Sequence, residues 1–293
     1  MKRRHSELSQ GSSSEHPLPH GPVDYPDIFA WPARVLERAK DVYGKALTRR
    51  NLATAKKVLL TSTFSGLGTA EVAMAMLAQE YQSGGESCFA IHSHCERDPE
   101  CLALLEAMPH PLSSDHLFSD VLDLLQRSEK ETLQNIVVYH REQFQKRWAQ
   151  SNVTCGREKQ RLQERQEELC LQEVIDFFDS VQLKARVACR KCSSSCPRCP
   201  SERDRIGAVW MEIAGSPCVP FLTGAYGSGL GWLHDVTAAF FVWAAFVRLY
   251  KPDLFLHENV PGFPPAILSR FLNRHEDLYE IQSVVFSPEV PCL

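Results

Sequence analysis

Two residues in separate stretches of the chain have side chains that could act together in one reaction. Cys218 stands between prolines in EIAGSPCVPF, and Glu258 stands in LHENVPGF. A thiolate beside a carboxylic acid suits addition to an electron-poor ring, because sulfur attacks one carbon while the acid protonates or hydrogen-bonds a ring nitrogen. For Cys218 taken alone, the alternative is a small apolar residue at the start of a loop, which is a common role of free cysteine.

The runs around these residues predict that both stand at the ends of buried strands. Residues 208–214 and 253–259 are short, rich in apolar residues and bounded by turn formers, as expected for strands. Pro217 ends the first of them, because proline does not continue a central strand. Open α/β sheets bind ligands at the carboxyl ends of parallel strands, so parallel strands would bring the two groups to one edge.

A glycine turn follows an earlier predicted strand. The stretch TFSGLGTAE joins the strand 57–64 to a helix at 69–81. Gly66 and Gly68 let the backbone approach a bound molecule closely, and the start of the helix offers free N–H groups. The third glycine of the dinucleotide fingerprint is absent at its usual spacing, so a plain tight turn is the alternative.

Acidic residues follow the next two predicted strands. Glu96 comes after 88–92, and Asp120 ends 116–120. An acid at the first position can accept hydrogen bonds from ribose hydroxyls, and Asp120 could accept one from an adenine amino group. The alternative for each is an acid favoured by the dipole of a helix N-terminus. Together with the glycine turn, they predict a nucleoside cofactor; a nicotinamide enzyme would have no use for Cys218 paired with Glu258.

In this order the elements resemble the cytosine-specific carbon-5 methyltransferases of DNA, a group with one branch that acts on transfer RNA. The motifs are FSGLG at 64–68, Glu96, Asp120, PCVPF at 217–221 and YKPDLFLHENVPGF at 250–263. The resemblance covers roughly residues 55–123 and 206–287. It implies an α/β fold of the class I S-adenosylmethionine-dependent methyltransferases, with a Rossmann-like mixed sheet and a helical, cysteine-containing insertion.

The resemblance also implies a role for each matching residue. The cofactor S-adenosyl-L-methionine would be held by Phe64, Ser65, Gly66, Gly68, Glu96 and Asp120. The substrate is DNA, from which the enzyme flips a cytosine into its pocket. Cys218 would then attack carbon 6 of the ring, and Glu258 would hold ring nitrogen 3. The implied activity is methyl transfer to carbon 5 through a covalent cysteine adduct.

The sequence departs from the family at several points. Val219 and Leu222 replace the polar residues that the family usually has there, and the connection between Asp120 and Cys218 is unusually long. The family's arginine motif, target-recognition domain and closing strand and helix do not appear before Leu293. The resemblance therefore implies a fragment or a chain that does not methylate by itself. The alternatives are an RNA cytosine methyltransferase and a catalytically impaired scaffold or regulatory protein.

Composition predicts a disordered tail at 1–24 and a charged helical insertion at 124–205. The resemblance implies that the segments beside the insertion, 25–123 and 206–293, are the first, cofactor-binding part and the second, catalytic part of one methyltransferase domain. Helices are expected at 28–52, 157–178 and 266–274, and a last strand at 280–286. The charged helix of the insertion could bind a protein partner or be a solvated face.

The insertion also contains two C-x-x-C pairs, formed by Cys189, Cys192, Cys196 and Cys199. This spacing suits a zinc site, although the pairs stand closer together than in a zinc ribbon; a cysteine-rich loop and an iron–sulfur cluster are the alternatives. Basic residues surround the pairs and could contact phosphates, with a solvated loop as the alternative. These residues are Arg186, Arg190, Lys191, Arg198, Arg203 and Arg205.

The whole chain has an ordinary composition for a globular protein. Its net charge of −4 gives no overall basic signature, so nucleic acid would have to bind at local patches. An apolar signal peptide is absent from the start, and eleven cysteines are therefore expected in a reducing compartment, the nucleus or alternatively the cytoplasm. The longest apolar run, 236–247, is too short to span a bilayer and predicts a buried helix.

Overall fold

The computed structural model describes residues 32–38, 57–81, 89–151, 156–222 and 227–285. The predicted disordered tail lies outside these residues, and so does most of the predicted helix at 28–52, of which 32–38 are helical.

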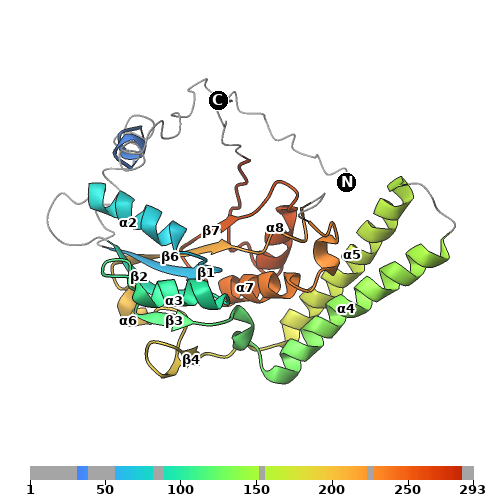
Figure 1. The fold of residues 1–293 in the computed structure, drawn as a ribbon, viewed down its shortest axis with the longest axis horizontal. Helices are drawn as coiled ribbons and strands as arrows, with labels where there is room; N and C mark the ends of the chain where they lie inside the picture. Colours follow the sequence, from blue (N-terminus) through green and yellow to red (C-terminus); the bar gives the residue numbers. More distant parts are fainter. Residues whose placement is uncertain (1–31, 39–56, 82–88, 152–155, 223–226, 286–293) are drawn as a thin grey trace.

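A five-stranded sheet forms the centre of the molecule, and its strands alternate with helices along the chain (Figure 1). Its strands are β1 (Lys57–Thr63), β2 (Phe89–Cys95), β3 (His116–Phe118), β6 (Ala208–Gly215) and β7 (Leu254–Glu258). The order is β3-β2-β1-β6-β7, and every neighbouring pair is parallel. The prediction of an α/β fold is thus confirmed, and the arrangement is compatible with a Rossmann-like fold. The expected mixed sheet is not found among the described residues, because all the strands that pair in this sheet run parallel.

Helices cover both faces of the sheet. Helix α2 (Thr69–Tyr81) packs on the face that carries Leu60 and Ile91. Helix α7 (Thr237–Tyr250) packs on the opposite face, which carries Trp210, and its long apolar run is buried as predicted. Helix α3 (Pro99–Ala107) packs on Leu117 of β3. Within the described ranges, no helix combines the length and the apolar character that crossing a bilayer needs.

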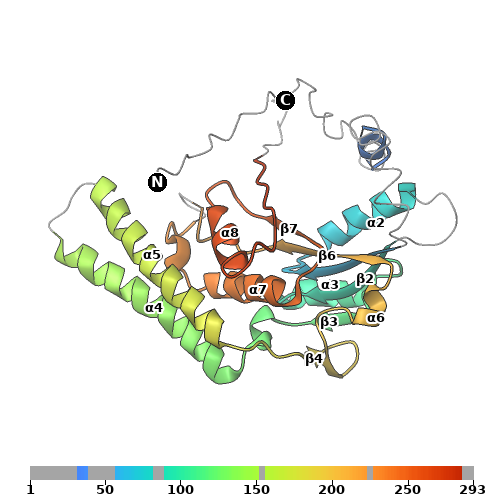
Figure 2. The same ribbon diagram turned by 180° about the vertical axis from the view of Figure 1, so that it is seen from behind.

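The segment between β3 and β6 contains two long helices and a small hairpin. These elements are η2 (Val121–Leu124), α4 (Arg127–Gln150), α5 (Gly156–Ser180), β4 (Val187–Cys189), β5 (Ser194–Cys196) and α6 (Glu202–Arg205). Helices α4 and α5 lie side by side at one end of the molecule (Figure 2). They share one continuous core with α7, η4 (Gly231–Leu233) and α8 (Ala266–Leu272), so the insertion is packed onto the main domain.

The prediction of a last strand at 280–286 is wrong for residues 280–285, the described part of this range, because they do not form a strand. Val284 and Val285 are 77% and 76% exposed. β propensity alone does not make a strand, and among the described residues no strand pairs with this segment.

Candidate active site and metal centre

The carboxyl ends of all five strands meet along one edge of the sheet. In the strand register, Thr63 lies opposite both Cys95 and Ala214, and Cys95 lies opposite Phe118. Gly215, at the end of β6, lies opposite Glu258, at the end of β7. The residues that follow these ends therefore share the edge, namely the turn at 64–68, Glu96, Asp120 and Cys218. The structure places the residues expected at this edge at or just after the carboxyl ends of neighbouring strands.

The turn after β1 has an unusual backbone conformation. Phe64, Gly66 and Gly68 all have positive φ angles, of 60°, 54° and 77°. Ser65 is fixed between them, since its N–H donates to the carbonyl of Cys95 at 3.2 Å and its Oγ accepts from the N–H of Cys95 at 3.3 Å. A Cβ atom added at Gly66 would meet nothing within 4 Å, so open space lies above the turn.

A buried polar cluster supports this turn from below. Ser62 donates to Glu71 of α2, and its Oγ lies 2.6 Å from the Oγ of Ser65. His94 of β2 places its Nδ1 3.0 Å from the Glu71 carboxylate, and both side chains are fully buried. Sequence reasoning missed this cluster, although polar residues inside apolar strands and an acid on an apolar helix were a signal for it.

The two acids are positioned by backbone N–H groups. Glu96 accepts from Gly66 at 2.7 Å through one oxygen and from Arg97 and Asp98 at 2.7 and 2.8 Å through the other. Asp120 accepts from Leu122 at 2.9 Å through Oδ1. Because a carboxylate offers about four acceptor positions, each acid keeps capacity for a further donor.

The loop that carries Cys218 is fixed by residues of the LHEN stretch. Asn259 donates from Nδ2 to the carbonyl and the hydroxyl of Ser216, at 3.1 and 3.0 Å. The Nε2 of His257 lies 2.8 Å from the same hydroxyl. The carbonyl of Cys218 accepts from the N–H groups of Phe221 and Leu222 at 2.9 and 3.2 Å, which closes a tight turn just after the thiol. The Cys218 side chain is half-buried.

The Glu258 carboxylate lies next to the start of this loop. A Cβ atom added at Gly215 would lie 3.4 Å from Oε2 of Glu258. Gly215 comes three positions before Cys218, and Glu258 is exposed. The sequence predicted Cys218 and Glu258 at neighbouring strand ends, and the structure places Glu258 at the end of β7 and Cys218 in the loop after the neighbouring strand β6.

The inserted helix α5 contacts the far side of the same loop. Gln163 donates from Nε2 to the carbonyl of Gly229 at 2.7 Å, and Gly231 donates its N–H to the carbonyl of Pro220 at 2.9 Å. A Cβ atom at Gly262 would lie only 2.4 Å from the backbone oxygen of Phe221. The segments around residues 163, 220, 230 and 262 therefore support one another.

Burial of His257 gives the loop a pH dependence. Desolvation lowers the pKa of His257 from the ordinary 6.5 to about 4. The unfolded chain therefore binds a proton in the interval between these values while the folded chain does not, so stability is lost as the pH falls from 6.5 toward 4. As the pH falls through this interval, we expect His257 to lower the free energy of unfolding by up to about 1.4 kcal/mol per pH unit.

Denaturant unfolding at a series of pH values measures this contribution. His257→Gln should flatten the curve between pH 6.5 and 4 relative to the wild type. Equal slopes for wild type and His257→Gln would contradict this expectation, because they would show that His257 binds a proton equally well in the folded and the unfolded chain.

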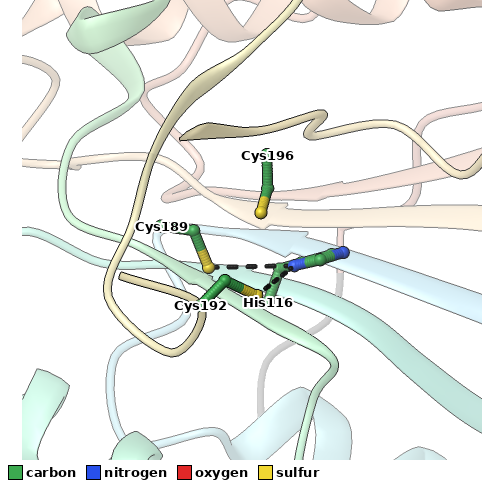
Figure 3. Close-up of side chains that lie close together, drawn as sticks. All are labelled: His116, Cys189, Cys192 and Cys196. Carbon is green, nitrogen blue, oxygen red and sulfur yellow. Dashed lines mark hydrogen bonds between the residues drawn. The ribbon is translucent and has the colours of Figure 1, made fainter. Parts of the chain in front are cut away.

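A second cluster of chemically active side chains lies beside β3, in the β4–β5 hairpin. The ligand atoms of His116, Cys189, Cys192 and Cys196 all lie within 4.8 Å of one another (Figure 3). The Nδ1 of His116 is 3.7 Å from the sulfur of Cys189 and 3.4 Å from that of Cys192. The residues named are able to hold a metal ion.

This group corrects the predicted set of ligands in one position. Three of the four predicted cysteines belong to it, but Cys199 does not, and His116 stands in its place. The chain turns into the core at Arg198, which is buried, so Cys199 packs against the main core instead. The spacing of the cysteines could not reveal His116, because it belongs to a different element.

Arg198 itself enters a buried polar network that sequence reasoning also missed. Its guanidinium donates to the hydroxyl of Thr63 at 2.5 Å, and Thr63 donates to the Glu212 carboxylate at 2.6 Å. Thr61 and Trp243 also donate to Glu212, the latter at 3.1 Å. Burial raises the pKa of Glu212, and Arg198 acts in the opposite direction.

Other basic residues of the hairpin make contacts within the chain. Arg190 forms an ion pair with Glu106 at 3.0 Å, and Lys191 donates to the hydroxyl of Ser113 at 2.9 Å. Arg186 donates to the carbonyl of Ser195 at 3.1 Å through Nε. These contacts favour a role within the fold over a basic surface held ready for phosphates.

Comparison of the chain with models of known families gives no match, and comparison with curated proteins gives none either.

Proposed function

We propose that the chain transfers a methyl group from S-adenosyl-L-methionine to carbon 5 of cytosine in DNA. One observation carries the proposal: a thiol and a carboxylate on neighbouring strand ends share the edge of a parallel sheet with a glycine turn and two acids. A nucleophile and an acid at this edge suit addition to a ring, and the other three groups suit an adenosine cofactor.

The residues at the edge fit the cofactor. Gly66 leaves open space above a turn with positive φ angles, where a bound molecule can approach the backbone. Glu96 retains acceptor capacity for a ribose hydroxyl, and Asp120, whose Oδ2 forms a long ion pair with Nζ of Lys130 at 3.9 Å, retains capacity for an amino group. When bound, S-adenosylmethionine supplies the electrophilic methyl group.

The chain's own residues would prepare the cytosine for that methyl group. The Cys218 thiolate forms a bond to carbon 6, and the electron pair of the 5,6 double bond moves toward carbon 5. Glu258, whose Oε2 lies 3.4 Å from a Cβ built on Gly215, would hydrogen-bond ring nitrogen 3 and stabilise the charge that reaches the ring. After carbon 5 carries the methyl group, a water molecule would take the carbon 5 proton. The electron pair of that C–H bond would re-form the 5,6 double bond, and the bond between carbon 6 and sulfur would break to release Cys218 as the thiolate.

Cofactor binding tests the first half of the proposal. We expect S-adenosylhomocysteine to bind, and Glu96→Gln to weaken it about tenfold, because a charge-assisted hydrogen bond becomes a neutral one. Isothermal titration calorimetry measures both affinities. Glu100→Gln, an exposed acid in the first turn of α3, is the matched control and should bind like the wild type.

The absence of heat on folded protein would contradict the proposal. Equal affinities for wild type and Glu96→Gln would also contradict the placement of the ribose at Glu96.

A further inference from the structure

The four potential ligands beside β3 come from separate positions that the fold brings together. His116 begins β3, Cys189 ends β4, and Cys196 ends β5, with Cys192 in the turn between the hairpin strands. His116 and Cys189 are separated by 73 positions in the sequence. Three thiols and one imidazole from separate positions thus approach to within 4.8 Å of one another, with Cys189 and Cys196 buried.

The spacing of the ligand atoms suits a single tetrahedral ion. Zinc binds thiolate sulfur at about 2.3 Å and imidazole nitrogen at about 2.0 Å, so a tetrahedron has N–S edges of about 3.5 Å and S–S edges of about 3.8 Å. The N–S distances of 3.7 and 3.4 Å agree with such an edge. A [2Fe–2S] or [4Fe–4S] cluster spreads its ligands around several iron atoms, for which this group is too compact.

The site has the features of a structural rather than a catalytic metal centre. Four protein ligands fill a tetrahedron and leave no position for water or substrate. Cys189 and Cys196 are buried, and all four cysteines of the hairpin region are free thiols. The group lies at the amino end of β3, whereas the proposed active site lies at the carboxyl edge of the sheet.

We propose that His116, Cys189, Cys192 and Cys196 bind one zinc ion that fastens the β4–β5 hairpin to the edge of the sheet. Besides the ligands, the N–H of Arg190 donates to the carbonyl of Leu117 at 2.8 Å, and Lys191 donates to the hydroxyl of Ser113 and the carbonyl of Ser114 at 2.9 and 2.7 Å. A metal that crosslinks these distant parts of the chain stabilises the folded state by the free energy of its binding. The proposal does not rest on methyltransferase activity.

Metal analysis of the full chain, purified without added metal, tests the proposal. We expect one zinc ion per chain by inductively coupled plasma mass spectrometry. After replacement with Co²⁺, the absorption spectrum should show tetrahedral cobalt with thiolate-to-metal charge transfer. The melting temperature should fall when a chelator removes the zinc and return when zinc is added.

Four variants identify the ligands. His116→Ala should lower zinc affinity more than about 100-fold. This loss is larger than the one expected from replacing a residue that only hydrogen-bonds a ligand. Cys199→Ser, which the sequence spacing includes but the structure leaves out, should retain one zinc. Cys192→Ser removes an exposed side chain, so its loss of zinc would not be a result of misfolding. Cys218→Ser should retain the zinc and its cobalt spectrum.

Several results would overturn the proposal. A chain that binds no zinc, and shows no thiolate–cobalt absorption on titration, has no such site. Stoichiometric iron in place of zinc would refute the choice of metal. Loss of zinc in Cys199→Ser with retention in His116→Ala would refute the assigned ligands and restore the set of four cysteines.

Discussion

Replacement of Cys218 by serine is expected to reduce methyl transfer to cytosine by a factor on the order of 10⁴ or more, because the proposed reaction needs a thiolate nucleophile. Transfer of a labelled methyl group from S-adenosylmethionine to DNA measures the effect. The fold should be unaffected, since Cys218 is half-buried in a loop fixed by backbone hydrogen bonds and by Asn259.

Two controls separate a chemical effect from a structural one. Cys199→Ser changes a half-buried cysteine outside both sites and should keep full activity. Binding of S-adenosylhomocysteine to Cys218→Ser should equal that of the wild type. Methyl transfer that survives in Cys218→Ser would remove this thiol from the reaction.

Replacement of Arg198 by alanine is expected to lower the free energy of unfolding by about 3–5 kcal/mol, because it leaves the buried Glu212 without its countercharge. Arg198 and Glu212 are 2% and 0% exposed, and the hydroxyl of Thr63 joins them. Denaturant unfolding measures the change.

Arg190→Ala is the matched control in the same hairpin. It also removes an arginine that pairs with a glutamate, but these side chains are 43% and 39% exposed, so the expected loss is below about 1 kcal/mol. Glu212→Gln in the Arg198→Ala background should recover part of the stability, since it removes the uncompensated charge. A loss below 1 kcal/mol for Arg198→Ala would mean that Glu212 is satisfied by its hydroxyl and indole donors alone.

The alternation of strands and helices could be predicted from the sequence, because each element has its own hydrophobic period. Helix α2 begins and ends where the pattern placed it, and β1 and β6 differ from the prediction by a single residue. The run at 280–285 has the same β-branched character but no strand beside it. Hydrophobic period indicates what an element could be, whereas pairing depends on neighbours that lie far away in the sequence.

The same distinction applies to the sites. Groups at strand ends could be predicted, because parallel strands present all their carboxyl ends at one edge. Contacts between side chains of separate layers could not be predicted from the sequence. The sequence gives no sign that His116 meets three cysteines of the hairpin, or that Arg198 reaches Thr63 at the end of β1. These contacts depend on how the insertion folds back onto β3 and β1.

Trapping of the covalent adduct tests the proposed function most directly. The protein is incubated with S-adenosylmethionine and either DNA or RNA that contains 5-fluorocytosine, whose fluorine blocks the final elimination and retains the bond to sulfur. We expect a denaturation-resistant band with DNA that is absent in Cys218→Ser. A band with RNA and none with DNA would mean that the substrate of the same reaction is RNA. The absence of a band with both, on protein that binds S-adenosylhomocysteine, would contradict catalysis and favour a cofactor-binding scaffold.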